Sequence, residues 1–199
     1  MASLLPSIGA LEGKVKISSS IPMVVSSLKR GGLIAYPTES VYGIGCDAWC
    51  QGAVERLQRI KKRQGKKGFI LLISDYAQLD RLIDMNNPSI VWDAIRSSWP
   101  GPITWVFPCH PDLPKWLVGV DSSIAIRMTA HPIAREICKV LASPLISTSA
   151  NLAGMPPCTN EQSVIDQLSS VLDVCVHNKS SCNDIPTSII DATTLTKLR

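Results

Sequence analysis

The segment Gly31-Gly-Leu-Ile-Ala-Tyr-Pro-Thr-Glu-Ser-Val-Tyr-Gly-Ile-Gly45 contains the features that decide the fold. Before it, Pro22 suits the first turn of a helix, and Gly31-Gly32 suits the end of that helix. Leu33 to Tyr36 is a short apolar run of the kind that forms a buried strand. Pro37 interrupts this strand, and a polar motif follows. A helix, a buried strand and a polar loop in this order are typical of layered α/β proteins.

Outward from this segment, apolar and amphipathic runs alternate from about residue 20 to residue 190. The periodicity predicts helices over 22–30, 51–62, 76–83, 89–98, 131–141 and 161–169, and strands over 33–36, 69–73, 103–107, 123–128, 144–147, 172–176 and 188–190. The length of 199 residues and the 45% hydrophobic content fit one domain. We therefore expect a single α/β domain over residues 21–199 and an N-terminal extension over residues 1–20.

Several classes of protein are disfavoured by composition. No apolar run approaches the roughly 20 residues that a membrane-spanning helix needs, and the first residues lack the pattern of a secretory signal. The seven cysteines include no C-x-x-C pair, so free thiols in a reducing cytoplasm fit best. Cys46 and Cys50 could share a metal, but two small, partly buried thiols are the simpler interpretation. We expect a soluble, cytoplasmic protein with no membrane partner.

The positive charge is concentrated in one short stretch. Residues 56–67 contain seven basic side chains and no acidic one, whereas the remaining residues carry a net charge of −3. One interpretation is a solvated helix end, where cations are favoured by the helix dipole. Another is a phosphate clamp made by Lys61, Arg63 and Lys67, because an arginine fork and lysine charges match a polyphosphate. A nucleic-acid footprint is equally compatible with this run.

The segment Gly43-Ile-Gly45-Cys46-Asp47-Ala48 formally matches a dinucleotide-binding fingerprint, G-x-G-x-x-A. Such a site needs its glycines directly between a strand and a helix, with an acidic residue about 20 positions later. Here Pro37 interrupts the approach, and the basic run occupies the later positions. We therefore do not expect nicotinamide or flavin binding, and we expect the glycines to allow close approach of backbone or ligand.

Two further features can carry chemistry. Ser147-Thr-Ser-Ala-Asn151 suits a capped turn, and no G-x-S-x-G elbow supports a nucleophilic serine. Arg127 is a lone charge in an apolar strand, and a buried guanidinium needs an anion. That anion is either an internal carboxylate, such as Asp47 or Asp121, or the carboxylate of a ligand.

Five motifs occur together in order: Tyr-Pro-Thr-Glu-Ser-Val-Tyr-Gly-Ile-Gly-Cys-Asp, Lys-x-Arg, Trp-Pro-Gly-Pro-Ile-Thr, Ala-Ile-Arg-Met-Thr-Ala-His-Pro and Ser-Thr-Ser-Ala-Asn. With these motifs the chain resembles the YrdC/TsaC family of threonylcarbamoyl-AMP synthases, closely from about residue 31 to 157. The resemblance implies a twisted sheet of parallel and antiparallel strands, with flanking helices around a concave basic cavity. It also points to the short, single-domain form of the family.

The resemblance further implies a reaction. L-Threonine, bicarbonate and ATP would give threonylcarbamoyl-AMP and pyrophosphate, for N6-threonylcarbamoyladenosine formation in tRNA. The expected partners beyond the substrates are a threonylcarbamoyl transferase complex and tRNA, and Mg²⁺ would enter with ATP. No covalent protein nucleophile is implied. The implied L-threonine site is Thr38, Arg127 and Ser147, and the implied ATP site is Lys61, Arg63, Lys67, Ser123, Ser149 and Asn151, with Lys61 and Arg63 stabilising the phosphates.

The chain departs from the family pattern at two places. Many relatives have Pro after the arginine and Asn-Pro a few positions later, whereas this chain has Gln64 and Lys67-Gly68. Longer members place a threonine-contacting His near the position of Leu72. Two other functions stay open from the residues. One is a non-catalytic RNA- or ribosome-binding factor that uses the basic stretch, and the other is a module that acts on carbamoyl phosphate.

Overall fold

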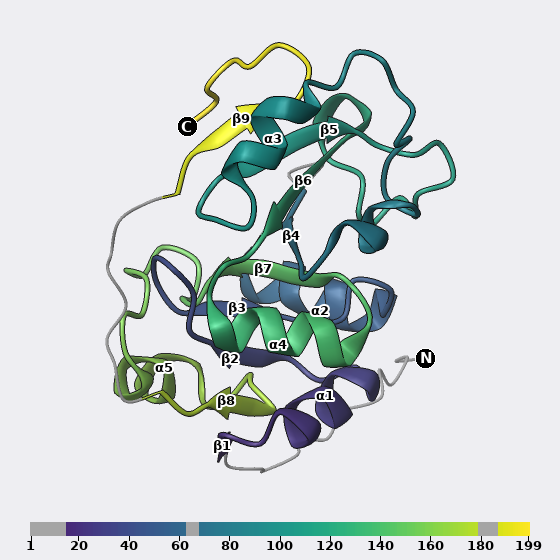
Figure 1. Ribbon diagram of the computed structural model, residues 1–199. Coiled ribbons are helices and arrows are strands. Elements are labelled where there is room, and N and C mark those ends of the chain that lie inside the picture. Colours follow the sequence, from purple (N-terminus) through teal and green to yellow (C-terminus); the bar gives the residue numbers. More distant parts are fainter. Residues whose placement is uncertain (1–14, 63–67, 179–186) are drawn as a thin grey trace, which may run out of the picture.

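A computed structural model describes residues 15–62, 68–178 and 187–199. Within these residues nine strands form one sheet in the order β1-β8-β2-β3-β7-β4-β6-β5-β9 (Figure 1). The strands are β1 (Lys16–Ser18), β2 (Ile34–Tyr36), β3 (Gly43–Gly45), β4 (Ile70–Ile73), β5 (Thr104–Pro108), β6 (Ser123–Met128), β7 (Leu145–Ser149), β8 (Val174–Val176) and β9 (Ile189–Asp191).

The sheet is mixed, as expected. β1 and β2 pair in parallel with β8, β4 with β6, and β5 with β9. Antiparallel pairing joins β2 to β3, β3 to β7, β7 to β4 and β6 to β5. The helices are α1 (Ile21–Lys29), α2 (Gln51–Ile60), α3 (Trp92–Ser98), α4 (Pro132–Leu141) and α5 (Glu161–Leu168), with short 3₁₀ turns at Tyr76–Leu79 and Val120–Ser122.

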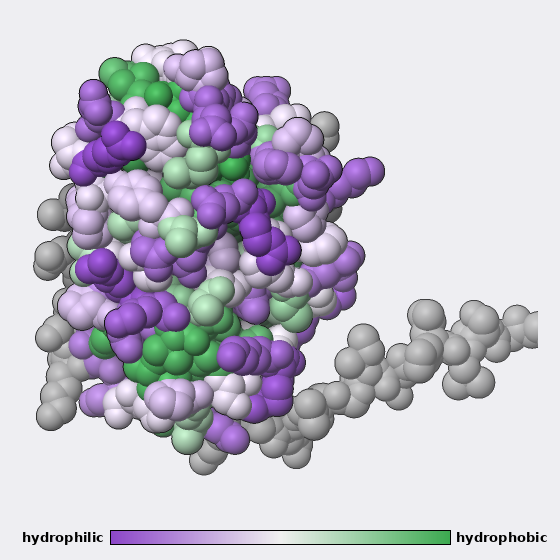
Figure 2. Space-filling view, turned by 45° about the vertical axis from the view of Figure 1, so that its right-hand side comes forward, coloured by the Kyte–Doolittle hydropathy of each residue, from purple (hydrophilic) through white to green (hydrophobic). Residues whose placement is uncertain are grey.

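Helices cover the two faces of the sheet unequally. One face packs against α2, α3 and α5 in a large core. The other face packs against α1 and α4 in a smaller core that includes Tyr36, Leu72 and Leu145. Figure 1 shows α1 and α4 together in the half of the molecule that holds β1, β2 and β8. In the space-filling view, hydrophobic residues gather low on the surface, at the height of these two helices (Figure 2).

Most predicted elements are confirmed within one to three residues. The helix expected over 76–83 is a 3₁₀ turn of four residues, and the helix expected from 89 begins at Trp92. Part of the expected N-terminal extension, Lys16–Ser18, is the edge strand β1. No described helix has the length and apolar character needed to cross a membrane.

The glycine segment is the largest departure from the predicted elements. Gly43–Gly45 is not a turn but β3, an interior strand between β2 and β7. Sequence patterns do not predict it because glycine disfavours strands. Its glycines are explained by close packing: a Cβ atom on Gly45 would lie 1.8 Å from the carbonyl oxygen of Ile146. The expected role in close backbone approach is thus confirmed for Gly45, whereas a Cβ atom on Gly43 would meet the side chains of Tyr36 and Thr38 at 3.1 and 3.2 Å. A strand-to-helix phosphate loop is absent from this position.

Gly45→Ala should lower the free energy of unfolding by at least about 3 kcal/mol, because backbone must move to admit the methyl group. Gly52→Ala is the matched control, since Gly52 lies in α2 and a Cβ atom there would meet nothing within 4 Å. The control should be neutral or up to about 1 kcal/mol more stable. Urea unfolding of both variants measures the difference. Equal stability of Gly45→Ala and the wild type would contradict the packing.

Candidate functional site

A cavity of about 660 Å³ continues the sheet face that α1 and α4 cover. Side chains alternate between the faces of a strand, so Leu72 and Ile70 of β4 share one face, as do Leu145 and Ser147 of β7. In register, Leu72 faces Leu145 and Ile70 faces Ser147. The first pair lies in the core under the helices, and the second pair lines the cavity. The cavity therefore begins where the helical cover ends.

Hydroxyl groups and arginines give the cavity its polar character. Strands β3 to β7 and β9 contribute to the wall, together with the loop after β2 and the C-terminal residues. The described lining contains Arg127 and Arg199 and no Asp or Glu side chain. It contains five of the expected site residues: Thr38, Ser123, Arg127, Ser147 and Ser149. A concave cavity with positive charge is therefore present, and it suits anionic ligands.

Arg127 is the most deeply buried charge in this wall, at 5% exposure. Its Nη1 donates to the Thr187 hydroxyl at 3.0 Å, and its Nη2 lies 4.0 Å from Oε2 of Glu39. Its buried Nε has no acceptor among the described residues. Burial lowers the pKa of Arg127, and the charge of Glu39 opposes that effect.

The expectation of an internal carboxylate is confirmed, but the residues named for it are wrong. Asp47 instead accepts hydrogen bonds from the Ser143 hydroxyl and from the Trp49 amide, and Asp121 is exposed in a 3₁₀ turn. The carboxylate is that of Glu39, which belongs to the motif after the first predicted strand. Its pairing with Arg127 could not be predicted, because a loop residue gives no sequence signal for a partner about 90 positions away.

Glu39 joins the loop after β2 to the start of α4. Its Oε1 accepts from the Thr129 hydroxyl at 2.7 Å and from the amides of Ala130 and His131 at 2.9 and 3.3 Å. Burial raises the pKa of Glu39, but Arg127 and these hydrogen bonds outweigh burial, so the pKa lies below its ordinary value. Glu39 is thus a held carboxylate that keeps its negative charge beside Arg127.

Thr38 and Ser123 present hydroxyls whose protons are already engaged. Thr38 donates to the carbonyl of Val41 at 2.6 Å, and Ser123 donates to the carbonyl of Val120 at 2.6 Å. Their oxygens keep lone pairs that can accept from a ligand. Ser147 is buried at 5% exposure on the same face of β7 as Ser149. These hydroxyls and Arg127 converge from three different segments of the chain.

Lys61 ties the end of α2 to the Ser-x-Asn motif. Its Nζ donates to the backbone oxygens of Ser149 and Asn151 at 3.0 and 2.9 Å and to Oδ1 of Asn151 at 2.7 Å. The Ser149 hydroxyl donates to the same Oδ1 at 2.7 Å. Ser149 lines the cavity, whereas Lys61 and Asn151 stand just behind the described wall. Arg63 and Lys67, which we also predicted as ATP contacts, lie outside the described residues.

The segment from Ser147 to Asn151, which was expected to form a capped turn, is partly strand and partly turn. Ser147 to Ser149 form the last residues of β7, paired with β3 and β4, and the turn begins at Ala150. Sequence reasoning also missed two lining residues, Thr187 and Arg199. Nη2 of Arg199 donates to the Thr187 carbonyl at 3.2 Å. Nothing in the sequence near either residue marks it as a ligand contact, because only the fold brings the C-terminal segment to the cavity.

The described part of the basic stretch does not form one continuous surface. Arg56 pairs with Asp173 at 3.2 Å and donates to the carbonyl of Gly31, whereas Lys61 turns toward Asn151. Only Arg59 and Lys62 are simply exposed. This arrangement gives no support to the RNA-binding alternative from the described side chains. Within the described ranges, no three His, Cys, Asp or Glu side chains gather as metal ligands.

Glu39→Gln should lower the free energy of unfolding by about 3 kcal/mol, because it leaves a buried guanidinium without its counter-charge. Glutamine keeps the shape and the acceptor oxygen, so the change removes mainly the charge. Asp93→Asn is the matched control: the Asp93–Arg96 pair has the same 4.0 Å separation but is exposed, and its loss should cost less than about 0.5 kcal/mol. Equal effects in urea unfolding would contradict the role of Glu39.

The Glu39 contribution should also depend on pH with a defined sign. Because the pKa of Glu39 is lowered by folding, its stabilisation is present above the unfolded-state pKa and is lost as pH falls through the folded-state pKa. The stability difference between wild type and Glu39→Gln should therefore be constant near neutral pH and shrink only in acid. Unfolding curves over the acid range measure it, and a difference that grew on acidification would contradict the sign.

Comparison with known proteins identifies the family. The family model for Sua5, YciO and YrdC, described as "Telomere recombination", matches residues 26–199. The threonylcarbamoyl-AMP synthase of Coxiella burnetii is 42% identical over 177 residues, which are 89% of this chain and 95% of that protein. Sua5 of P. abyssi complexed with L-threonine is 28% identical with a TM-score of 0.80, over 89% of this chain and 52% of that one. E. coli YciO is 26% identical with a TM-score of 0.78, over 93% and 92%. The chain is a member of the Sua5/YciO/YrdC family.

Proposed function

We propose that the chain is an L-threonylcarbamoyladenylate synthase, which forms threonylcarbamoyl-AMP and pyrophosphate from L-threonine, bicarbonate and ATP. The observation that carries this proposal is the buried Arg127, which faces a hydroxyl-lined cavity with its Nε free of any described acceptor. The curated relative from Coxiella burnetii is named for this activity, and this chain spans 95% of its length.

We propose that L-threonine binds in this cavity against Arg127. A carboxylate on Arg127 would accept a hydrogen bond from Nε, which no described residue engages, whereas Glu39 lies 4.0 Å from Nη2. Thr38 and Ser147 stand on neighbouring walls, where their hydroxyls can bond to the polar groups of threonine. The P. abyssi Sua5 structure contains L-threonine, which supports an amino-acid site in this fold.

ATP is placed against the Ser-x-Asn side of the cavity. Ser149 lies on the cavity wall, and Asn151 connects it to Lys61 through the shared Oδ1. The ammonium group of Lys61 would meet a phosphate oxygen by exchanging one of its three described acceptors. Ser123 faces the same cavity from β6. We also assign Arg63 and Lys67 to the phosphates.

The chemistry requires positioning more than protein nucleophiles. Bicarbonate takes up a proton and loses water to give carbon dioxide. The neutral amine of threonine then adds to the carbon dioxide and releases a proton, which gives a carbamate. A carbamate oxygen then attacks the α-phosphorus of ATP, and the bond to pyrophosphate breaks. Held substrates and fixed positive charge lower the barrier to such a step. Arg127 would orient threonine, and Lys61 with Arg63 would offset charge on the phosphates.

Mg²⁺ is proposed to enter as its complex with ATP. The described cavity wall offers hydroxyls and arginines but no Asp or Glu side chain, and Mg²⁺ favours phosphate and water oxygens with few protein ligands. The metal would therefore reside on the nucleotide phosphates and lower their charge. Removal of Mg²⁺ with a chelator should abolish pyrophosphate release.

The product requires a second protein. Threonylcarbamoyl-AMP is a mixed anhydride that a transferase must take over for N6-threonylcarbamoyladenosine formation, so we propose a threonylcarbamoyl transferase complex and tRNA as partners. We also place the protein in the cytoplasm, which the six free cysteines among the described residues support.

Pyrophosphate release by the purified chain with Mg²⁺–ATP tests the proposal directly. Release should require both L-threonine and bicarbonate, and mass spectrometry should detect threonylcarbamoyl-AMP. Pyrophosphate release without threonine but with carbamoyl phosphate would instead support a module that acts on carbamoyl phosphate. No release despite demonstrated ATP binding would contradict the synthase function.

Arg127→Ala should reduce threonine-dependent turnover by about 30-fold or more, because truncating one partner of a buried charge pair costs roughly 2 to 5 kcal/mol. Arg127→Lys keeps the charge but loses the fork, and it should also raise the apparent threonine KM. Arg135→Ala, an exposed arginine outside the described cavity wall, should behave as wild type. A folded Arg127 variant with an unchanged threonine KM would contradict the assignment of Arg127 to the threonine carboxylate.

A further inference from the structure

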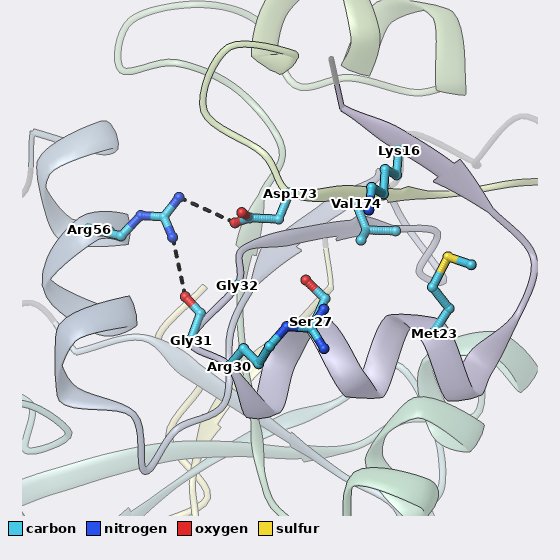
Figure 3. A pocket seen from close by; sticks show the side chains of 9 residues that line it. All are labelled: Lys16, Met23, Ser27, Arg30, Gly31, Gly32, Arg56, Asp173 and Val174. Atoms are coloured by element: carbon cyan, nitrogen blue, oxygen red, sulfur yellow. Dashed lines mark hydrogen bonds and ion pairs between the residues drawn. The ribbon is translucent and has the colours of Figure 1, made fainter. Parts of the chain in front are cut away.

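A second cavity, of about 280 Å³, lies between α1, β1 and the start of β8 (Figure 3). Its lining combines Lys16, Arg30 and Arg56 with a single carboxylate, Asp173. No residue is shared with the catalytic cavity. Gly32 precedes β2 and Thr38 follows it, so the two cavities lie at opposite ends of that strand, at most roughly 20 Å apart along the chain.

The only carboxylate in this second cavity is already paired. Oδ2 of Asp173 accepts from Nη2 of Arg56 at 3.2 Å and from the amide of Leu33 at 2.8 Å. Arg56 also donates to the carbonyl of Gly31 at 3.2 Å, and Figure 3 shows both contacts of Arg56 on one side of the pocket. Arg56 and Asp173 therefore balance each other, and the charge that remains comes from Lys16 and Arg30.

Lys16 and Arg30 reach the cavity with little to neutralise them. Arg30 donates to the hydroxyl of Ser26, and Lys16 has no side-chain partner among the described residues. Both side chains are exposed, and neither has a carboxylate within ion-pair distance in the described ranges. Two cations on the rim of a small cavity create a positive potential that attracts an anion.

Ser27 adds a hydroxyl to the cavity wall. The residue is 6% exposed and lines the cavity, and its hydroxyl makes no hydrogen bond to a described residue. This hydroxyl is therefore available to a ligand. In Figure 3 Ser27 stands on α1 between the side chains of Arg30 and Met23.

Two carbonyls at the end of α1 are already engaged by backbone amides. The carbonyls of Ser27 and Leu28, which would otherwise carry the negative end of the α1 dipole, accept from the amides of Gly32 and Gly31. The carbonyl of Gly31 accepts from Arg56. Met23 and Val174 supply apolar contacts on the remaining side. The cavity thus offers two cations without a carboxylate partner among the described residues, one available hydroxyl and an apolar edge.

We infer that this cavity is a second anion site, which binds a phosphate group away from the catalytic cavity. A phosphate monoester or diester matches two cations and a hydroxyl donor. The group could belong to a small phosphorylated molecule or to the backbone of an RNA, and the chemistry at Ser27, Lys16 and Arg30 is the same for both.

Inorganic phosphate is the first probe, added to isotopically labelled full-length chain at constant ionic strength. Phosphate should shift the amide signals of Ser27 and Gly32, and those of Ser147 to Ser149 report the catalytic cavity separately. Lys16→Gln/Arg30→Gln should weaken the first response about tenfold or more. Lys115→Gln/Arg135→Gln is the control, because it removes the same charge from exposed positions outside both described cavity linings.

Ser27→Ala separates ligand binding from folding. Because the hydroxyl has no described partner, its removal should leave unfolding by urea unchanged or slightly improved, while phosphate binding weakens about tenfold. None of these variants touches the catalytic cavity, so pyrophosphate release should persist in all of them. This test remains valid if the proposed synthase function is wrong, because the amide signals report phosphate binding and not turnover.

A tRNA transcript is the second probe and identifies the source of the phosphate. If RNA supplies it, Lys16→Gln/Arg30→Gln should weaken tRNA binding and reduce the slope of log affinity against log salt by about 1.5 to 2 relative to the control. If only inorganic phosphate binding weakens, the ligand is a small phosphorylated molecule. Amide signals of Ser27 and Gly32 that respond to neither probe, or respond equally in the variants and the control, would overturn the site.

Discussion

The burial of one positive charge constrains the whole site. Arg127 stands in an apolar strand at 5% exposure, so the surrounding structure must supply negative charge and hydrogen-bond acceptors. Glu39 and Thr187 meet this need only in part, at 4.0 and 3.0 Å, and Nε is left over. A guanidinium that is held in place but incompletely paired is prepared for a ligand carboxylate.

The sheet explains why the charge is available to a ligand at all. The face that carries Leu72 and Leu145 is closed by α1 and α4. On the same face, Ile70 and Ser147 lie farther along β4 and β7, and Arg127 lies beside Leu72 on β6; these three residues line the cavity. Because side chains alternate between the two faces of a strand, one face of these strands forms a core where the helices cover it and lines a cavity where they do not. The packed glycines of β3 let β2 and β7 approach closely enough to complete this wall.

The sequence predicts much of this arrangement, and its failures are local. Apolar runs predict nearly all strands and helices, because burial sets the periodicity of α1, α2, α4 and β6. Apolar runs do not predict β3, because glycine lacks strand propensity and Gly45 is required by the approach of the Ile146 carbonyl. Short motifs that resemble those of a known family predict five of the residues that line the cavity: Thr38, Ser123, Arg127, Ser147 and Ser149. The sequence does not predict the positions of Glu39, Thr187 and Arg199 at the site, because these depend on contacts between segments distant in sequence.

The central claim is that Arg127 holds the carboxylate of the amino-acid substrate. A crystal structure of the chain with L-threonine and a non-hydrolysable ATP analogue tests it most directly. The threonine carboxylate should bind to Nε and an Nη of Arg127, with Thr38 and Ser147 within hydrogen-bond distance and the phosphates beside Lys61 and Ser149. Threonine bound elsewhere, with Nε of Arg127 still unpaired, would contradict it.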